Sequence, residues 1–378
     1  MLRLIFLGTL VLVGILSGQR FARASEDNVV HIVSWGGKFQ SDLMSSWVAP
    51  AAKRSGLILQ TDSWDGDYGA LTRRVSIGLN TWDLVHVESY YVMTPGHDQL
   101  FRSFPKRSLP TISATYLNDP LLVTILNEGY AAPVLEYAYI AATREDLLPQ
   151  NAKQTSYGWK EFWDLKRLPG HRGLRDFPIG NLEAALVSLG HSPQSYLYDP
   201  TLAKDVIQHR VQEALDRLHE LRGYIVWWKT GDQLEASLDS GDMVFAGAWS
   251  GRLLSVHREL CKTVTVAQCR LKTALDSALI STDWWVIPAN TTRGEAADKL
   301  VKALFSREAV DGAKQFSERQ GYTAPINDKI SADPVAQFYL NAGSSGNTQA
   351  VARIDERFWS ANFDWINEEW QSWRLANQ

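Results

Sequence analysis

The chain of 378 residues has few sulfur-containing residues, no excess of basic charge and almost no long apolar run. It contains two cysteines and four methionines, and its 42 acidic residues outnumber its 38 lysines and arginines. A protein without basic tracts lacks the electrostatic footprint that binds nucleic acid or an anionic membrane surface. We therefore expect neither of these as a partner.

The short motifs of common enzyme classes are also missing. No GxxxxGK[ST], GxGxxG or HExxH motif occurs, and the eight histidines are scattered. The segment GAWSG (247–251) differs from the GxSxG elbow of hydrolases, because its serine stands one position too late. The segment DGDYG (65–69) lacks the remaining ligands of a calcium loop and indicates a turn before a helix. We expect no enzymatic activity, no cofactor and no metal site.

The one long apolar run lies at the N-terminus, from Leu4 to Leu16. It is too short to span a bilayer as a helix, and Ala22-Arg23-Ala24 has the pattern of a signal-peptidase site. We predict a signal peptide over residues 1–24, cleavage near Ala24-Ser25 and a periplasmic location; an uncleaved membrane anchor is the alternative. Removing residues 1–24 takes away three arginines and no acid, which lowers the net charge from −4 to −7.

The only cysteines, Cys261 and Cys269, stand close together in CKTVTVAQC. A close pair in an oxidising compartment predicts a disulfide that closes a small loop or hairpin. Metal binding is disfavoured because no histidine or second cysteine pair stands at ligand spacing.

Strand-like and helix-like segments alternate along the chain. Two helices are expected within 199–223 and 294–306, where apolar residues recur on one face. The expected buried strands are NVVHIVSW (28–35), WDLVHVESYY (82–91), APVLEYAYIAAT (132–143), DMVFAGAW (242–249) and DWWVIP (283–288). This alternation predicts an α/β fold with parallel sheet, in which ligands bind beyond the carboxyl ends of strands.

Aromatic and acidic residues gather at the expected strand ends. Packing in the core explains each of the fifteen tryptophans singly, but their position beside carboxylates suits an organic cation. Two glycines follow Trp35, where they let a ligand or an opposite lobe approach the backbone. The residues concerned are Trp35, Gly36, Gly37, Glu88, Ser89, Tyr90, Asp176, Trp249, Asp283 and Trp285.

Five segments in order resemble the periplasmic solute-binding proteins of ABC importers, in the spermidine/putrescine-binding branch. They are SWGGKFQ, WDLVHVESYYV, SYGWKEFWDLKRLPGHRG with the acid that follows it, GAWSGRL and STDWWVIPANT; the segment FWSANFDWINEEWQSW resembles the C-terminal helices of many members. The resemblance implies the type II periplasmic-binding-protein fold, in which two α/β lobes joined by crossover strands enclose the ligand.

The resemblance also implies residue roles. It carries pocket aromatics onto Trp35, Tyr90 and Trp249, and amine-binding acids onto Asp176 and Asp283. We therefore predict that the three aromatic side chains wall the site while the two acids hold a cationic group, one from either side of the cleft. The implied function is capture of a polyamine or related amine for a permease of the inner membrane, by a monomer.

The implied domain organisation has five segments. They are the signal peptide (1–24), the first part of lobe 1 (25–137), lobe 2 (138–283), a return to lobe 1 (284–345) and C-terminal helices packing on lobe 2 (346–378).

The sequence departs from the polyamine-binding pattern at two positions. Gly180 replaces the second acid, and Ser281 replaces a tryptophan two residues before the crossover acid. Another amine, an opine or other amino-acid derivative, and an uncharged solute therefore remain open. So do a ferric-ion binder using one of Tyr90 and Tyr91, an exported hydrolase, and a sensory role in place of transport.

Overall fold

A computed structural model describes residues 28–103, 109–153, 157–262, 264–326, 331–344 and 346–376. The predicted signal peptide and its cleavage site lie outside these residues. In the described part, the strands are β1 (Val29–Ser34), β2 (Ile58–Ser63), β3 (Leu84–Glu88), β4 (Ala131–Arg144), β5 (Arg172–Arg175), β6 (Ile225–Trp228), β7 (Phe245–Trp249), β8 (Leu271–Thr273), β9 (Leu279–Val286) and β10 (Ala352–Arg353).

Helices separate most of these strands. The α-helices are α2 (Gly37–Leu43), α3 (Ala49–Arg54), α4 (Tyr68–Ser76), α5 (Ser89–Met93), α6 (Ala114–Leu117), α7 (Pro120–Glu128), α8 (Trp159–Phe162), α9 (Asn181–Ser188), α10 (Pro193–Tyr196), α11 (Lys204–His219), α12 (Gly231–Ser240), α13 (Ser250–Cys261), α14 (Gly294–Leu304), α15 (Val310–Gln320), α16 (Pro334–Ala342) and α17 (Glu356–Ala376). A π-helical stretch, η1 (Met44–Val48), joins α2 to α3, and the 3₁₀ turns are η2 (His97–Leu100), η4 (Glu145–Leu147), η5 (Gln150–Ala152), η6 (Val266–Gln268), η7 (Leu275–Ser277) and η8 (Arg307–Ala309).

The strands form one sheet whose two halves repeat the same pattern. The order is β2-β1-β3-β9-β4-β7-β5-β6, with β10 paired to β9 and β8 to β4. In the first half β1 lies parallel between β2 and β3, with β9 antiparallel to β3. In the second half β5 lies parallel between β6 and β7, with β4 antiparallel to β7. The predicted α/β fold with parallel sheet is confirmed.

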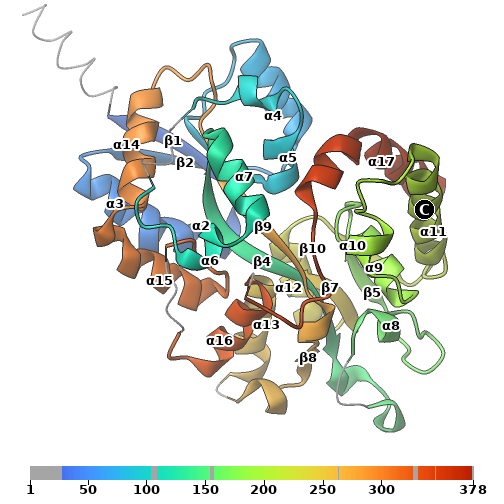
Figure 1. The fold of residues 1–378 in the computed structure, drawn as a ribbon. Helices are drawn as coiled ribbons and strands as arrows, with labels where there is room; N and C mark the ends of the chain where they lie inside the picture. The colour runs from blue at the N-terminus through green and yellow to red at the C-terminus, as the bar shows by residue number, and fades with distance from the viewer. Residues whose placement is uncertain are drawn as a thin grey trace, which may run out of the picture.

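Two long strands, β4 and β9, join the halves and pair with each other antiparallel. Figure 1 shows them between a group containing β1, β2 and α14 and a group containing β5, α9 and α11. Every residue of both strands is buried, since both faces are covered by packed elements. The predicted lobe boundaries at 137/138 and 283/284 both fall within these strands.

The C-terminal helix α17 contacts both halves. Phe363 packs on Tyr90 of α5, with ring centroids 4.5 Å apart, and Trp370 packs on Trp227 of β6 at 5.6 Å. Figure 1 shows α17 running from near α5 toward α11. The helix therefore lies across the junction of the halves, in contact with more than lobe 2.

Two local predictions are confirmed. Cys261 and Cys269 form a disulfide, and the Asp67 side chain accepts a hydrogen bond from the Ala70 backbone at the start of α4, as expected of a turn before a helix.

Three boundaries differ most from expectation. The strand expected at 283–288 runs from Leu279 to Val286, so Asp283 and Trp285 lie within it and not at its start. The strand expected over WDLVHVESYY (82–91) ends at Glu88, because the next residues, Ser89–Met93, form the helix α5. The helix predicted to start at Asp199-Pro200 starts at Lys204, since the Asp199 carboxylate instead accepts a hydrogen bond from the Thr201 backbone in the preceding turn.

Candidate ligand-binding site

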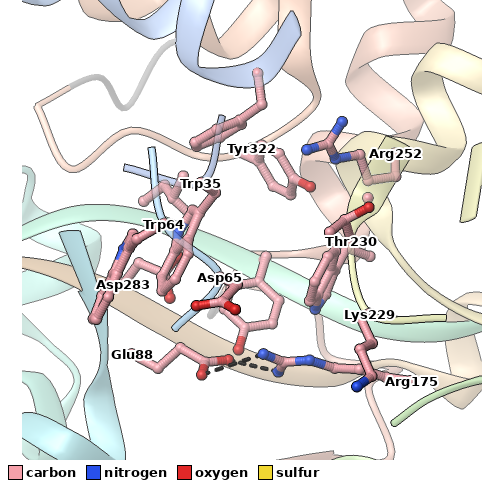
Figure 2. Close-up of a pocket in the computed structure, with 15 residues that line it drawn as sticks. Trp35, Trp64, Asp65, Glu88, Arg175, Lys229, Thr230, Arg252, Asp283 and Tyr322 are labelled. Carbon is pink, nitrogen blue, oxygen red and sulfur yellow. Dashed lines mark hydrogen bonds and ion pairs between the residues drawn. The ribbon is translucent and has the colours of Figure 1, made fainter. Parts of the chain in front are cut away.

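A cavity of about 620 Å³, including its open mouth, lies between the two halves. Most of its lining follows the carboxyl ends of the parallel strands, where open α/β sheets bind ligands. Figure 2 shows the lining, which consists of Trp35, Phe39, Trp64, Asp65, Glu88, Leu135, Tyr137, Arg175, Lys229, Thr230, Gly231, Trp249, Arg252, Asp283 and Tyr322.

Two stacked tryptophans form one wall of the cavity. Trp35 follows β1 and Trp64 follows β2, and because these strands are parallel neighbours their ends bring the indoles together. The ring centroids are 5.4 Å apart with planes inclined by 10°. The Trp35 Nε1–H group donates to Asp283 Oδ2 at 3.0 Å, which fixes the indole plane.

The glycines after Trp35 line an adjoining mouth rather than the main cavity. Gly36 and Gly37 have φ angles of 71° and 61°, in the region that favours glycine. A Cβ atom on Gly37 would lie 2.6 Å from the Asp232 carboxylate of α12. The glycines therefore permit close approach between the halves at this mouth.

A buried ion pair links the halves across one end of the cavity. Arg175, which ends β5, places Nη1 2.7 Å from Oε1 of Glu88, which ends β3 (Figure 2). Burial alone would lower the pKa of Arg175, but the Glu88 carboxylate raises it above its ordinary value. The guanidinium also lies over Phe177 and Trp249, 4.4 and 5.0 Å from the ring centroids.

Asp283 on β9 is the most enclosed acid of the lining, with 5% of its surface exposed. Its Oδ2 accepts from Trp35 and lies 3.0 Å from His86 Nε2. Its Oδ1 has no hydrogen-bond partner among the described residues. This oxygen is an acceptor that the protein leaves unused.

The remaining charged groups differ in how far the protein neutralises them. Arg252 of α13 pairs with Asp232 and Glu235 of α12 at 2.9 and 2.8 Å. Asp65 and Lys229 of the cavity lining are exposed and form no ion pair with any described residue. Burial and neighbouring Glu88 raise the pKa of the Tyr68 and Tyr90 phenols well above 10, so both stay neutral near pH 7.

The cavity lining thus carries charges of both signs in equal number. The acids are Asp65, Glu88 and Asp283, and the cations are Arg175, Lys229 and Arg252. The arrangement can neutralise an ammonium and a carboxylate on one ligand.

Four residues of the predicted site line the cavity, namely Trp35, Glu88, Trp249 and Asp283. The predicted ammonium-binding acid Asp176 does not. Its carboxylate pairs with Arg374 of α17, with Nε–Oδ1 at 2.8 Å, so a partner within the chain occupies it. The predicted pair of acids facing each other across the cleft is therefore not found.

Three more predicted residues lie in the core beside the cavity. Ser89 Oγ donates to the Thr282 carbonyl and accepts from Trp284 Nε1, so both of its roles are used. Tyr90 lies on α5 under Phe363, and Trp285 is fully buried against His86, with ring centroids 4.9 Å apart. Each is covered by a side chain from a distant part of the sequence.

The cationic side chains were not among the predicted residues. Arg175 directly precedes Asp176, and Lys229 and Trp64 each follow a parallel strand by one residue. Their position at or just after the end of a parallel strand was the sequence signal that could have identified these residues. Because a cationic ligand was expected, acidic residues were predicted to bind it and the neighbouring cationic residues were not.

Neither a metal centre nor a membrane span is visible in the described part of the chain. No group of three or more His, Cys, Asp or Glu residues there is arranged to hold a metal ion. No helix in those residues has the length and apolar character needed to cross a bilayer.

Comparison with known proteins extends these observations. Residues 58–341 match the family model described as bacterial extracellular solute-binding protein. A γ-aminobutyric acid-binding protein of Pseudomonas aeruginosa is 23% identical over 365 residues, covering 95% of each chain.

Several solved structures are similar in fold. A structure described as a GABA receptor has a TM-score of 0.72 and 22% identity, covering 92% of this chain and 97% of its own. The binding protein MotA of A. tumefaciens B6 in complex with glucopine has a TM-score of 0.70 and 19% identity, covering 91% and 99%. The spermidine/putrescine-binding protein PotD of Streptococcus pneumoniae has a TM-score of 0.62 and 16% identity, covering 92% and 99%. The chain therefore has the two-lobe type II fold of periplasmic binding proteins, as the resemblance implied.

Proposed function

We propose that the solute of this chain is a small zwitterion carrying one ammonium and one carboxylate group. The chain belongs to the family of bacterial extracellular solute-binding proteins and acts as the substrate-binding component of an ABC transporter. An ω-amino acid of the size of 4-aminobutyrate is the simplest zwitterion of this kind. The names of the γ-aminobutyric acid-binding relative and of the GABA receptor structure support this choice.

The observation that carries the proposal is that groups of both signs without an ion-pair partner among the described residues, Asp65 and Lys229, line one cavity together with the partnerless Oδ1 of Asp283. A charged hydrogen bond contributes about 1.5–3 kcal/mol. An ammonium on the unused oxygen of Asp283 and a carboxylate near Lys229 or Arg175 would together supply a large part of the roughly 8 kcal/mol needed for micromolar affinity.

A polyamine fits this cavity less well. Putrescine has two cationic ends and no anionic group, so Lys229, which forms no ion pair with any described residue, would stand near it without gaining a partner. Like charges in a partly dry site repel strongly. We therefore replace the polyamine expected from the sequence by a zwitterion.

An opine is the second candidate. The main cavity and the mouth share six lining residues, so a ligand can extend from one into the other: Trp35, Trp64, Asp65, Thr230, Gly231 and Arg252. The mouth adds Asp62, Ser63 and Trp82, which suit a polyhydroxylated arm. The glucopine complex of a structurally similar protein supports this alternative.

The remaining parts of the proposal concern place and partners. We place the protein in the periplasm after cleavage near Ser25, as a monomer delivering its solute to an inner-membrane permease. We propose the lobe limits implied by the resemblance, 25–137 with 284–345 for lobe 1 and 138–283 for lobe 2, with the helix α17 in contact with both halves. Export is supported by the family and by the sequence of residues 1–24.

Isothermal titration calorimetry on the mature chain tests the proposal with four matched probes. We expect 4-aminobutyrate to bind at least about tenfold more tightly than butyrate or butylamine, since each lacks one charged hydrogen bond. Putrescine is the fourth probe. Tighter binding of putrescine or butylamine than of 4-aminobutyrate would contradict a zwitterionic ligand.

A further inference from the structure

Three buried polar side chains form a chain from the core of the first half to the cavity. Ser34 ends β1, His86 lies within β3 and Asp283 lies on β9, and these strands are neighbours in the sheet. Ser34 Oγ is 2.8 Å from His86 Nδ1, and His86 Nε2 is 3.0 Å from Asp283 Oδ2. Ser34 and His86 are 0% exposed.

The imidazole of His86 is held in place on several sides. Its ring centroid lies 5.2 Å from Trp35, 4.9 Å from Trp285 and 5.9 Å from Phe39. The imidazole is thus packed among buried rings. This packing and the contact of Ser34 with Nδ1 favour the orientation that presents Nε2 to Asp283.

The hydrogen-bonding roles follow from the position of Ser34. Among the described residues, His86 Nδ1 is the one partner of the Ser34 hydroxyl group. A buried hydroxyl group needs an acceptor for its proton, and Nδ1 can accept only if the ring proton sits on Nε2. The Nε2–H group then faces Asp283 Oδ2 in an electrostatic contact, since its geometry is not that of an ordinary hydrogen bond.

The contacts of the Asp283 carboxylate fall on only one of its two oxygens. Trp35 Nε1 and His86 Nε2 both lie 3.0 Å from Oδ2, whereas Oδ1 has no partner in the described part of the chain. A buried carboxylate oxygen without a partner is costly unless a ligand supplies the donor. The protein thus holds one oxygen of the carboxylate and leaves the other, which is buried in this arrangement of the halves, without a partner.

We propose that His86, oriented by Ser34, is a positioning residue that holds Asp283 so that its Oδ1 accepts the ammonium group of the ligand. This inference rests on the proposed function, because it assigns the ammonium end of the zwitterion to a particular oxygen. It also assigns Ser34 and His86, which do not line the cavity, a part in selecting ammonium-bearing solutes.

A double-mutant cycle tests this role with 4-aminobutyrate and butyrate as probes. His86→Phe keeps the ring packing and removes the nitrogens, and we expect it to weaken 4-aminobutyrate about tenfold while leaving butyrate unchanged. Asp283→Asn should have a similar effect. In the Asp283→Asn background, His86→Phe should change affinity by less than about twofold, since the effect passes through Asp283.

Two further variants separate positioning from folding. His86→Gln keeps an N–H donor near Asp283 and should restore most of the preference for 4-aminobutyrate over butyrate. His209→Phe, on the exposed face of α11, is the matched control and should change neither affinity. Circular dichroism and thermal unfolding check that each variant is folded. If the losses from His86→Phe and Asp283→Asn multiply, or if both probes weaken equally, the proposal is wrong.

A ligand-independent measurement keeps the inference separate from the proposed function. In protein labelled with ¹⁵N-histidine, His86, assigned through His86→Gln, should show the neutral tautomer with the proton on Nε2. Asp283→Asn and Ser34→Ala should each shift its signals. A proton on Nδ1 overturns the inference even if 4-aminobutyrate binds. Failure of both probes to bind would contradict the proposed function, and the tautomer would still decide the inference.

Discussion

At the scale of single residues, the site depends on which side chains are neutralised within the chain and which are left for a ligand. Asp176 is paired with Arg374, whereas its neighbour Arg175 lines the cavity and pairs with Glu88. Both Glu88 and Arg175 are largely buried, with 9% and 15% of the side chain exposed. Removing one partner of such a pair leaves an uncompensated charge.

We therefore predict a strongly non-additive effect on stability at this pair. Arg175→Gln or Glu88→Gln alone should lower the free energy of unfolding by on the order of 3 kcal/mol, because each leaves a buried charge unpaired. The double variant should recover at least half of that loss. Urea unfolding of the four proteins in the absence of ligand measures the coupling. Additive losses would show that the pair is solvated and contributes little.

At the scale of secondary-structure elements, the start of α17 carries a buried acid. Glu356 is 1% exposed; its Oε1 accepts a hydrogen bond from Ser281 of β9, and its Oε2 has no partner among the described residues. Burial raises the pKa of Glu356 from 4.5 to about 7, and Asp355 adds to the rise, while nearby Arg353 opposes it. The helix thus packs on a joining strand through a group that titrates near neutrality.

This pKa predicts a pH-dependent stability. Between pH 4.5 and 7 the folded chain holds a proton on Glu356 that the unfolded chain has lost, so the contribution of this group to stability falls as pH rises through about 7. The difference is on the order of 3 kcal/mol. Glu356→Gln should be about as stable as the parent at pH 5 and more stable than it at pH 8.

Urea unfolding at pH 5, 6, 7 and 8 checks this expectation. Glu369→Gln, an exposed change on the same helix, is the control and should follow the parent at every pH. Equal pH dependence of Glu356→Gln and the parent would mean that Glu356 stays ionised in the folded chain.

At the scale of the whole molecule, the cavity lies between two halves that share the strands β4 and β9. Lining residues come from both halves, so a ligand that contacts Asp283 and Trp35 on one side and Arg175 and Trp249 on the other favours the arrangement in which the halves are close. A ligand shifts such an equilibrium only through its differential affinity for the two arrangements.

We predict that ligand binding makes the molecule more compact. Small-angle scattering of residues 25–378 should show a smaller radius of gyration with saturating 4-aminobutyrate than without it, and no change with butyrate at the same concentration. Chromatography should recover the added solute chemically intact. An unchanged radius at a concentration where calorimetry shows saturation would contradict closure.

The order of strands and helices could be predicted from local sequence patterns, because secondary structure depends largely on residues that are neighbours in the sequence. Alternating strand and helix, the disulfide between Cys261 and Cys269, and the aromatic residues at strand ends all follow from short segments. The same reasoning missed α5, because SYYVM after β3 has the composition of a strand and its helical form is set by packing against α17.

By itself the sequence determined that Trp35, Glu88 and Trp249 stand near strand ends, where open α/β sheets bind ligands. Only the tertiary structure decided which of the predicted residues face the cavity. Neighbours such as Arg175 and Asp176 point in different directions, and Arg374, 198 positions after Asp176, takes the acid out of use. Likewise, Asp283 and His86 are 197 positions apart and come together only because β9 lies beside β3. The charge offered to a solute is what remains after such long-range pairs form, and local sequence carries no information about them.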